Sequence, residues 1–155
     1  ALLAAIPQSA RVLCAGIEGV DPERAHFKLY WRLAEVVPLA AFGDPLFADP
    51  AFARFARLAV GERTLPARAI VASAGFTLGG EPAGVKLDLC TCSGCAARAG
   101  TQWHALLGQL EAELGVPIGR RAQALALGSP AFVGFGLSRD GRRRVNLYLT
   151  PERLP

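Results

Sequence analysis

Apolar and polar residues alternate in three stretches of the chain, and each stretch has the pattern of a β-hairpin. The last of them, Phe132 to Thr150, consists of an apolar run, the turn Ser138-Arg139-Asp140-Gly141 and a strictly alternating second run. Asp-Gly between two alternating segments is typical of a tight hairpin turn, because glycine adopts the positive φ that such turns require. Residues 14–33 and 74–92 repeat this arrangement around turns that contain proline and acidic residues. The sequence therefore predicts three hairpins.

The second strand of each hairpin is expected to have an apolar and a polar face, because side chains alternate along a strand. The apolar faces consist of Phe27, Leu29, Trp31 and Leu33, of Val85, Leu87, Leu89 and Thr91, and of Val145, Leu147 and Leu149. The polar faces consist of His26, Lys28, Tyr30 and Arg32, of Lys86, Asp88, Cys90 and Cys92, and of Arg144, Asn146, Tyr148 and Thr150. Tyr30, Asp88 and Tyr148 follow one another at intervals of 58 and 60 residues (88 − 30 and 148 − 88), which indicates a repeated supersecondary unit.

Helical segments are predicted between the hairpins. Residues 32–42 form the first candidate, and Asp49 is expected to cap a second that runs from Pro50 to Gly61. Between the second and third hairpins, Thr101 is expected to cap a helix that Gly115 ends, and residues 119–127 form a fourth candidate that closes at Gly128-Ser129-Pro130.

The resulting order of elements, ββ-αα-ββ-αα-ββ, predicts an α+β protein. We interpret residues 1–155 as a single domain with three hairpin repeats, at about 11–70, 71–130 and 131–155. Helices are expected to cover the apolar faces of the sheet. The polar faces then either line the lumen of a sheet that closes into a barrel, or form the solvent-exposed face of an open antiparallel sheet. Alternation by itself leaves both arrangements open.

Composition argues against several classes of protein. With 52% hydrophobic and 19% charged residues the chain is not expected to be disordered, and it has no apolar run long enough to span a bilayer. The net charge of +4 is a weak sign of an anionic partner, but the basic residues are dispersed, so neither a nucleic acid nor a membrane partner is predicted. The one basic cluster, Arg142-Arg143-Arg144, is interpreted as part of a solvated turn.

The ends and the cysteines of the chain add two expectations. The first ten residues lack the positive region of a signal peptide, and the absence of methionine suggests that upstream sequence is missing. Four cysteines in 155 residues do not make a disulfide scaffold, so a cytoplasmic location is expected.

Cations on the predicted polar faces favour an anionic ligand. If the three second strands converge, lysine and arginine would supply charge, and phenols and an amide would supply neutral donors. The alternative is a solvated face without a ligand. Several cations with few carboxylates favour a multiply charged ligand such as a diphosphate, and the candidates to bind it are Lys28, Tyr30, Lys86, Arg144, Asn146 and Tyr148. Candidates to line the same lumen are His26, Arg32, Asp88 and Glu18.

The cysteines form a competing constellation. Cys92-x-x-Cys95 has a spacing found in zinc sites, with Cys90 nearby and His104 or Cys14 as a fourth ligand. No second CxxC follows, and free thiols at a strand end are the simpler interpretation. The prediction is therefore that no metal is bound.

The ββαα repeat, with a polar-x-Tyr pattern on the second strand of each hairpin, resembles the ABBA-fold aromatic prenyltransferases of the dimethylallyltryptophan-synthase type. His26-Phe27-Lys28-Leu29-Tyr30 is similar to the Arg-x-Lys-x-Tyr strand of that family, with histidine in place of arginine. Val145-Asn146-Leu147-Tyr148 resembles the strand that ends the barrel, whereas Val85-Lys86-Leu87-Asp88 has Asp where tyrosine is common. The resemblance covers three of the family's five hairpins, so this chain would be the C-terminal part of a longer barrel.

The resemblance implies transfer of an isoprenyl group from an allylic diphosphate to an electron-rich aromatic or indole acceptor. It implies a partial barrel with helices outside, no required cofactor and an optional Mg²⁺, because an Asp-rich metal motif is lacking. The acidic residue that the family uses near the acceptor would lie in an earlier repeat, so no catalytic residue is assigned. Partners would be the diphosphate, the acceptor, and either a second copy of the chain or a missing N-terminal half. The alternative function is a non-catalytic binding or assembly module that retains the repeat.

Overall fold

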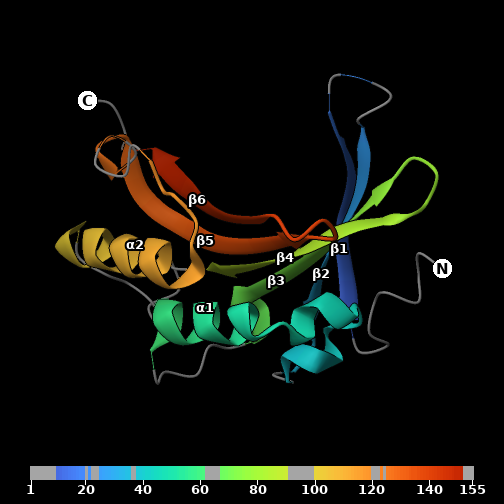
Figure 1. The fold of residues 1–155 in the computed structure, drawn as a ribbon, viewed down its shortest axis with the longest axis horizontal. Helices are drawn as coiled ribbons and strands as arrows, with labels where there is room; N and C mark the ends of the chain where they lie inside the picture. The colour runs from blue at the N-terminus through green and yellow to red at the C-terminus, as the bar shows by residue number, and fades with distance from the viewer. Residues whose placement is uncertain are drawn as a thin grey trace.

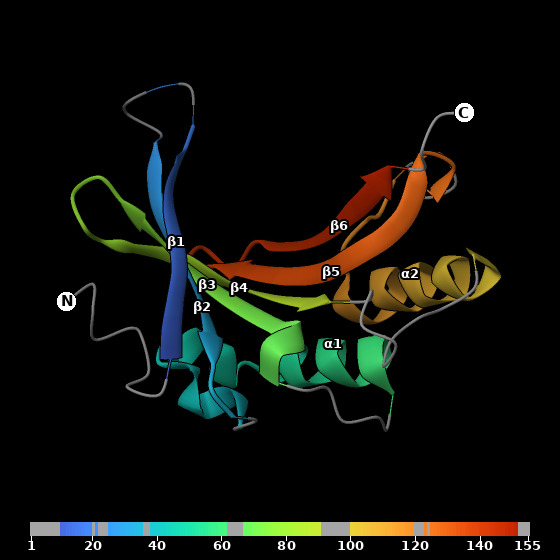
Figure 2. The ribbon, with the colours of Figure 1, turned by 180° about the vertical axis from the view of Figure 1, so that it is seen from behind.

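A computed structural model describes residues 10–19, 21, 25–35, 38–61, 67–90, 100–119, 123 and 125–151. Six antiparallel strands form one sheet in which each strand pairs with its neighbours in the sequence. Figures 1 and 2 show that the sheet curves strongly along its length. The three predicted hairpins are present as β1 (Ala10–Glu18) with β2 (His26–Leu33), β3 (Ile70–Thr77) with β4 (Pro82–Cys90), and β5 (Gly128–Ser138) with β6 (Arg143–Pro151).

Two α-helices, α1 (Pro50–Val60) and α2 (Gly100–Leu114), lie on the same face of the sheet (Figures 1 and 2). Asp49 caps α1 as predicted: its Oδ1 accepts a hydrogen bond of 2.8 Å from the backbone N–H of Ala51, and Pro50 occupies the first turn. None of the described helices is long and apolar enough to cross a membrane.

The helix predicted over residues 32–42 is wrong. Strand β2 continues to Leu33, and the only helical part of the segment in the described residues is the 3₁₀-helix η3 (Leu39–Phe42), followed by η4 (Pro45–Ala48). Pro38 is the physical reason that we identify, because proline disfavours the α-conformation in the residue before it and cannot donate to a helical hydrogen bond. The apolar residues that suggested a helix belong instead to a strand and to a short 3₁₀ turn.

The second pair of predicted helices also needs correction. Helix α2 begins at Gly100, one residue before the expected cap Thr101, whose side chain lies outside the described residues. Gln123 and Leu125 are helical, but most of the predicted helix at 119–127 is not described. Gly128 to Pro130, interpreted as a break, is the start of β5. A third 3₁₀-helix, η5 (Ala67–Ala69), leads into β3.

The core lies between the sheet and its helices, and it contains the predicted apolar faces of β2 and β4. Leu29, Trp31 and Leu33 of β2, and Val85, Leu87 and Leu89 of β4, are buried. Val145 and Leu147 of β6 pack against the same core. At its centre the ring of Phe135 contacts Phe52 and Phe55 of α1, with ring centroids 4.9 and 5.8 Å apart. The period-two pattern thus predicted correctly which face of the sheet is covered.

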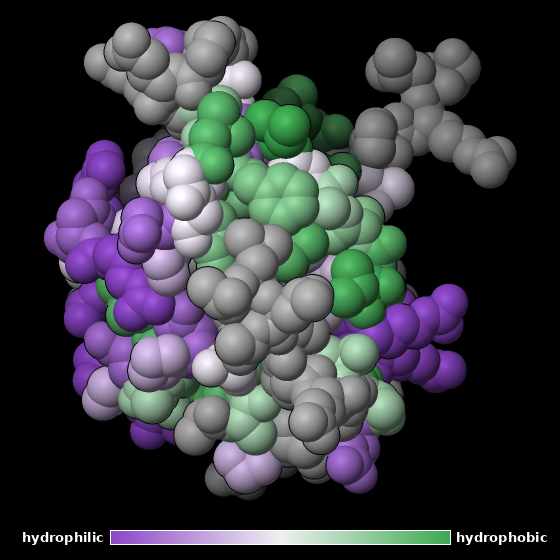
Figure 3. All heavy atoms as spheres, turned by 90° about the vertical axis from the view of Figure 1, so that its right-hand side faces the viewer, coloured by the Kyte–Doolittle hydropathy of each residue, from purple (hydrophilic) through white to green (hydrophobic). Residues whose placement is uncertain are grey.

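The sheet is open, since β1 and β6 are each paired on one side only within the described residues. Figure 3 looks onto the β1 edge, where hydrophobic residues gather at the surface. Val12, Leu13 and Ile17 of β1 are 48, 42 and 69% exposed. Of the two arrangements that alternation allowed, this chain by itself adopts the open sheet, and the curvature makes it part of a barrel rather than a flat layer.

Residues at equivalent positions of the sequence repeat do not lie side by side in the sheet, because successive hairpins are shifted along the strand direction. Across the sheet, Tyr30 of β2 lies level with Lys86 of β4 and Arg144 of β6, through Ser73 and Gly136 of the strands between. The residues equivalent to Tyr30 in the repeat, Asp88 and Tyr148, lie two and four positions further along their strands (88 − 86 and 148 − 144). A constant stagger of this kind accompanies the strand tilt of barrels.

Phe135→Ala should lower the free energy of unfolding by about 3–5 kcal/mol, because it leaves a cavity between β5 and α1 that the surrounding aromatic rings cannot fill. Denaturant unfolding followed by circular dichroism measures this. Leu78→Ala, in the exposed β3–β4 turn, is the control and should change stability by less than about 0.5 kcal/mol. Equal effects of the two substitutions would contradict the assignment of Phe135 to the core.

Candidate functional site

The face of the sheet opposite the helices carries the predicted polar residues. A continuous row across the sheet runs from Tyr30 through Ser73, Lys86 and Gly136 to Arg144. The neighbouring row joins Asp88, Gly134 and Asn146, and the next joins Cys90, Phe132 and Tyr148. All six candidate diphosphate-binding residues therefore lie on one face, although they come from three hairpins.

Lys28 is held by residues of its own hairpin. Its Nζ lies 2.8 Å from both Oε1 and Oε2 of Glu18 on β1, and the hydroxyl of Tyr30 donates a hydrogen bond of 3.1 Å to Oε1 of Glu18. The ammonium group also lies 5.7 Å from the centroid of the Tyr30 ring. Glu18 was a candidate for lining the lumen, and the structure places it against two of the candidate diphosphate-binding residues.

Lys86 has an equivalent set of partners that comes from different places in the sequence. Its Nζ lies 2.8 Å from Oδ2 of Asp88, two residues along the same strand, and donates a hydrogen bond to the hydroxyl of Tyr148. The ammonium group lies 4.9 Å from the Tyr148 ring centroid and 5.8 Å from that of Tyr30. Lys86 therefore sits between two tyrosine rings.

Two glycines of β5 make room for these side chains. A Cβ atom at position 134 would lie 2.0 Å from Oδ1 of Asp88, and one at position 136 would lie 2.8 Å from Nε of Arg144. Contacts that short do not occur between real atoms, so larger residues would displace Asp88 and Arg144. Gly134 and Gly136 thus allow a carboxylate and a guanidinium group to lie over the middle of the sheet.

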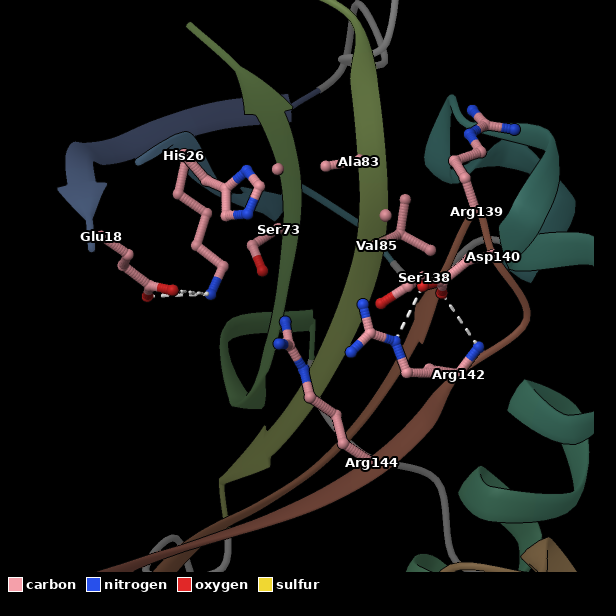
Figure 4. A pocket seen from close by; sticks show the side chains of 13 residues that line it. Glu18, His26, Ser73, Ala83, Val85, Ser138, Arg139, Asp140, Arg142 and Arg144 are labelled. Carbon is pink, nitrogen blue, oxygen red and sulfur yellow. Dashed lines mark hydrogen bonds and ion pairs between the residues drawn. The ribbon is translucent and has the colours of Figure 1, made fainter. Parts of the chain in front are cut away.

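An open pocket of about 290 Å³ occupies the part of the face next to the hairpin turns. Glycines of β3 and β4, Gly75 and Gly84, form part of its lining together with His26, and its charged residues are Glu18, Lys28, Arg139, Asp140, Arg142 and Arg144. Figure 4 shows Arg142 and Arg144 reaching toward it from one side, and Glu18, His26 and Ser73 on the other. Cations outnumber carboxylates in this lining, which suits an anionic ligand.

The cations of the pocket differ in how they are paired. Lys28 is paired with Glu18, and Nε of Arg142 lies 2.7 Å from Oδ2 of Asp140. Arg139 lies 2.7 Å from Oδ2 of Asp44, the residue that caps η4, so this ion pair holds the β5–β6 turn against the helical layer. Arg144 has neither a hydrogen bond nor an ion pair to any described residue. Its guanidinium group is therefore available to a ligand.

Burial and pairing shift several pKa values on this face. The hydrogen bond from Lys28 lowers the pKa of Glu18, and burial lowers the pKa of Lys28 in spite of that partner. Burial alone would lower the pKa of Lys86, but Asp88 and Tyr148 outweigh it and the pKa is raised. Burial raises the pKa of Asp88 against the opposing effect of Lys86. Burial and the charge of Glu18 raise the pKa of Tyr30, so its phenol stays protonated.

Some functional candidates were missed in the sequence. Ser73 is fully buried on the polar face and its Oγ has no hydrogen-bond partner among the described residues. It was detectable, since Ser73 and Thr77 are the two polar residues of the otherwise apolar strand β3. The turn interpretation of Arg142-Arg143-Arg144 is wrong for Arg143 and Arg144, which both lie on β6, and Arg144 also lines the pocket. Of the four predicted lining residues, His26 and Glu18 are in the pocket, whereas Arg32 and Asp88 share the face but not the pocket.

The described residues include only some of the side chains proposed as zinc ligands. Cys14 on β1 and Cys90 on β4 are free thiols with two strands between them, so Cys14 is not placed to complete a site at Cys90. His104 is exposed on α2, on the opposite side of the sheet. Cys92 and Cys95 lie outside the described residues, and no group of three or more metal-ligating side chains occurs within the described ones. The zinc-like spacing stays an untested alternative.

A curved antiparallel sheet with helices on one face and a polar concave face defines a class: the fold is that of the ABBA aromatic prenyltransferases, as a partial barrel. The 5-dimethylallyltryptophan synthase from Streptomyces coelicolor has the same fold with a TM-score of 0.73 and 19% identity, covering 96% of this chain and 47% of that protein. AnaPT from Neosartorya fischeri follows with a TM-score of 0.64 and 16% identity, covering 93% of this chain and 40% of that one.

These similarities concern the fold. No protein-family model and no curated protein sequence matches the chain. The chain spans less than half the length of either solved structure. The fold predicted from the repeat is thus confirmed, whereas activity has to be argued from the residues of the polar face.

Glu18→Gln should lower the free energy of unfolding at neutral pH, and this destabilisation should disappear at acidic pH. The pKa of Glu18 is below its ordinary value of 4.5, so its contribution to folding is present above that pH and disappears as pH falls through the lowered pKa. The stability difference between the two proteins, measured by urea unfolding, should be largest near neutral pH and should shrink as the pH falls below 4.5 and through the lowered pKa of Glu18. Glu81→Gln in the exposed β3–β4 turn is the control and should show no such trend. A difference that stays constant with pH would contradict the Glu18–Lys28 pair.

Proposed function

We propose that this chain forms the diphosphate-binding part of an aromatic prenyltransferase barrel. The observation that carries the proposal is Arg144, whose guanidinium group has no partner among the described residues and faces a pocket lined by further cations. An allylic diphosphate in this pocket would accept hydrogen bonds from Arg144 and from Lys28. The similarity of fold to 5-dimethylallyltryptophan synthase supports the reaction class.

The proposed reaction is an electrophilic substitution. The bond between the allylic carbon and the diphosphate oxygen breaks, the diphosphate leaves with the electron pair, and an electron-rich ring carbon forms a new bond to the allylic carbon before that ring loses a proton. Cationic side chains would stabilise the charge that develops on the leaving diphosphate. The rings of Tyr30 and Tyr148 lie next to Lys86 and would face the allylic cation, which aromatic faces attract. Mg²⁺ is not needed in this scheme, although it can accompany the diphosphate.

The alternative is a binding or assembly module without catalysis. The internal pairing of both lysines favours it, because Glu18 and Asp88 already neutralise Lys28 and Lys86. Under this alternative the face would bind anions weakly or not at all, and no prenyl group would be transferred to an aromatic acceptor. Turnover of an allylic diphosphate with an indole acceptor distinguishes the two functions.

Arg144→Gln should weaken binding of a non-hydrolysable dimethylallyl diphosphate analogue by about 10- to 100-fold, since it removes charge-assisted hydrogen bonds. A ligand that binds only the folded protein raises its melting temperature, so the shift in Tm with ligand concentration reports the affinity. Inorganic diphosphate separates recognition of the phosphates from that of the prenyl chain.

Arg143→Gln is the matched control for Arg144. Arg143 is the preceding residue of β6, points to the other face and donates a hydrogen bond of 3.4 Å to the carbonyl of Leu114 on α2. The Arg143→Gln substitution removes the same charge from the protein as Arg144→Gln does, but not from the pocket. Analogue binding should therefore stay within about twofold of the wild type. Absence of any analogue-dependent Tm shift in the wild type would favour the non-catalytic alternative.

We also propose that a second copy of the chain covers the β1 edge. Val12 and Ile17 lie level with Trp31 and Phe27 of β2, and yet they are exposed. An exposed apolar edge strand offers unpaired backbone groups and hydrophobic area together, which favours pairing with another strand.

Ile17→Lys should therefore convert a dimer to a monomer in size-exclusion chromatography with light scattering, because it places a charge on the proposed interface. Leu78→Lys is the control: Leu78 is similarly exposed but lies in the β3–β4 turn, away from the edge. A monomeric wild type at concentrations of about 100 µM would contradict pairing with a second copy, since stable interfaces bind more tightly than that.

A further inference from the structure

Strand β1 forms an edge of the sheet, and a bulge in it changes which of its residues share a face (Figure 3). Its register with β2 shifts by one residue between Val12 and Cys14, so Leu13 is the extra residue of a β-bulge. In a regular strand, residues an odd number of positions apart lie on opposite faces. The bulge reverses this relation for residues on either side of it.

The bulge places two opposite charges on the polar face of β1. Arg11 and Glu18 are seven residues apart (18 − 11), so a regular strand would separate them onto different faces. Instead, Arg11 lies opposite Arg32 and Glu18 lies opposite His26, and both of these partners belong to the polar face of β2. The two ends of β1 therefore present a cation and a carboxylate on the same side of the sheet.

The apolar residues of β1 follow the same rule. Val12 and Ile17 are five residues apart (17 − 12), and yet both lie opposite residues of the apolar face of β2, Trp31 and Phe27. Without Leu13, the paired residues of β1 on one side of Ala15 are 14, 12 and 11, and those on the other side are 16, 17 and 18. The pattern is therefore self-complementary about Ala15: the cation matches the carboxylate, and the two exposed apolar residues match each other.

Arg11 needs a counter-charge that β2 does not supply. It is exposed, and it makes neither a hydrogen bond nor an ion pair to any described residue. Its direct neighbour Arg32 has the same charge, and like charges at opposite positions of a ladder are destabilising. The other edge strand, β6 (Arg143–Pro151), contains no acidic residue, whereas β1 itself carries Glu18. Charge complementarity therefore favours a second β1 as the strand that pairs with this edge.

We propose that two copies of the chain pair through β1, antiparallel and symmetric about Ala15. This register rests on the pairing with a second copy proposed above, and specifies it. Arg11 of each copy lies opposite Glu18 of the other, and Val12 of each copy lies opposite Ile17 of the other. Oppositely charged pairs and apolar pairs across a ladder both stabilise it, and a two-fold interface forms each pair twice.

The same register brings a residue of one copy to the pocket of the other. Glu18 lines the pocket and holds Lys28 at 2.8 Å, while its own side chain is still 55% exposed. The exposed part of this carboxylate can accept a second cation. Arg11 of the second copy would therefore share Glu18 with Lys28, and pairing would add a positive charge to the rim of each pocket.

Disulfide cross-linking measures the register directly. In a Cys14→Ser background, Ala15→Cys should cross-link two copies under mild oxidation, because the Cα atoms of opposite residues lie about 4.5–5.5 Å apart, within the reach of a disulfide. Ile17→Cys is the matched control on the same exposed strand. In this register its Cα would lie at least about 13 Å from that of the other copy, four positions of about 3.3 Å, so it should not cross-link. Non-reducing gel electrophoresis shows the outcome, with the Cys14→Ser protein as the background.

A charge reversal tests the complementarity without cysteine chemistry. Arg11→Glu would place two carboxylates at each end of the interface, so the Kd of the dimer should rise about 10-fold or more. Arg57→Glu makes the same change on the exposed surface of α1, and should leave the Kd within about twofold of the wild type. Sedimentation equilibrium gives the three values. An unchanged Kd in Arg11→Glu contradicts the proposed register.

The register, the second copy and the pocket fail in different ways. A wild-type dimer that cross-links faster through Ile17→Cys, or through neither cysteine, overturns the register and leaves the second copy supported. A monomeric wild type overturns both, and the bulge would then protect the edge from pairing. Absence of diphosphate binding by a dimer that cross-links through Ala15→Cys overturns the proposed prenyl transfer and leaves the register supported.

Discussion

Two lysines buried on one face of the sheet impose the main constraint on this structure. Lys28 and Lys86 are 7 and 2% exposed, and a buried ammonium group without a counter-charge is strongly destabilising. Each therefore has a carboxylate oxygen at 2.8 Å, from Glu18 on the neighbouring strand and from Asp88 on the same strand. Correct pairing of β1 with β2 is thus required for charge balance as well as for backbone hydrogen bonds.

The same constraint shapes the chemistry of the face. Because the two carboxylates neutralise the lysines, the guanidinium group of Arg144 is the cation of the pocket that stays available among the described lining residues, and Gly136 allows its side chain to lie across β5. On the other side of Lys86, Gly134 allows Asp88 to turn one oxygen away from the lysine. Cations thus gather near the hairpin turns and acceptors beyond Lys86.

Residues that lie next to one another in the site do not occupy equivalent positions of the sequence repeat. A barrel needs staggered strands, so the lateral neighbours of Tyr30 are Lys86 and Arg144, and not its repeat equivalents Asp88 and Tyr148. Lys86 consequently bonds to Tyr148, a residue 62 positions away, whereas Lys28 bonds within its own hairpin. Similar motifs on three strands therefore produce different environments across the sheet.

The alternation of residues along β2, β4 and β6 was sufficient to predict three hairpins, the buried face and the polar face, because a strand has a period of two whatever it packs against. It also identified Lys28, Lys86 and Arg144, since cations on a half-buried strand are conspicuous. The helix predicted over residues 32–42 failed because its apolar residues were assigned without regard to Pro38.

The partners of Lys28 and Lys86 and the availability of Arg144 were decided only by the tertiary structure. They depend on the stagger between strands, which brings together residues 62 positions apart in the sequence, and on which cation obtains a carboxylate. No local pattern of residues contains that information.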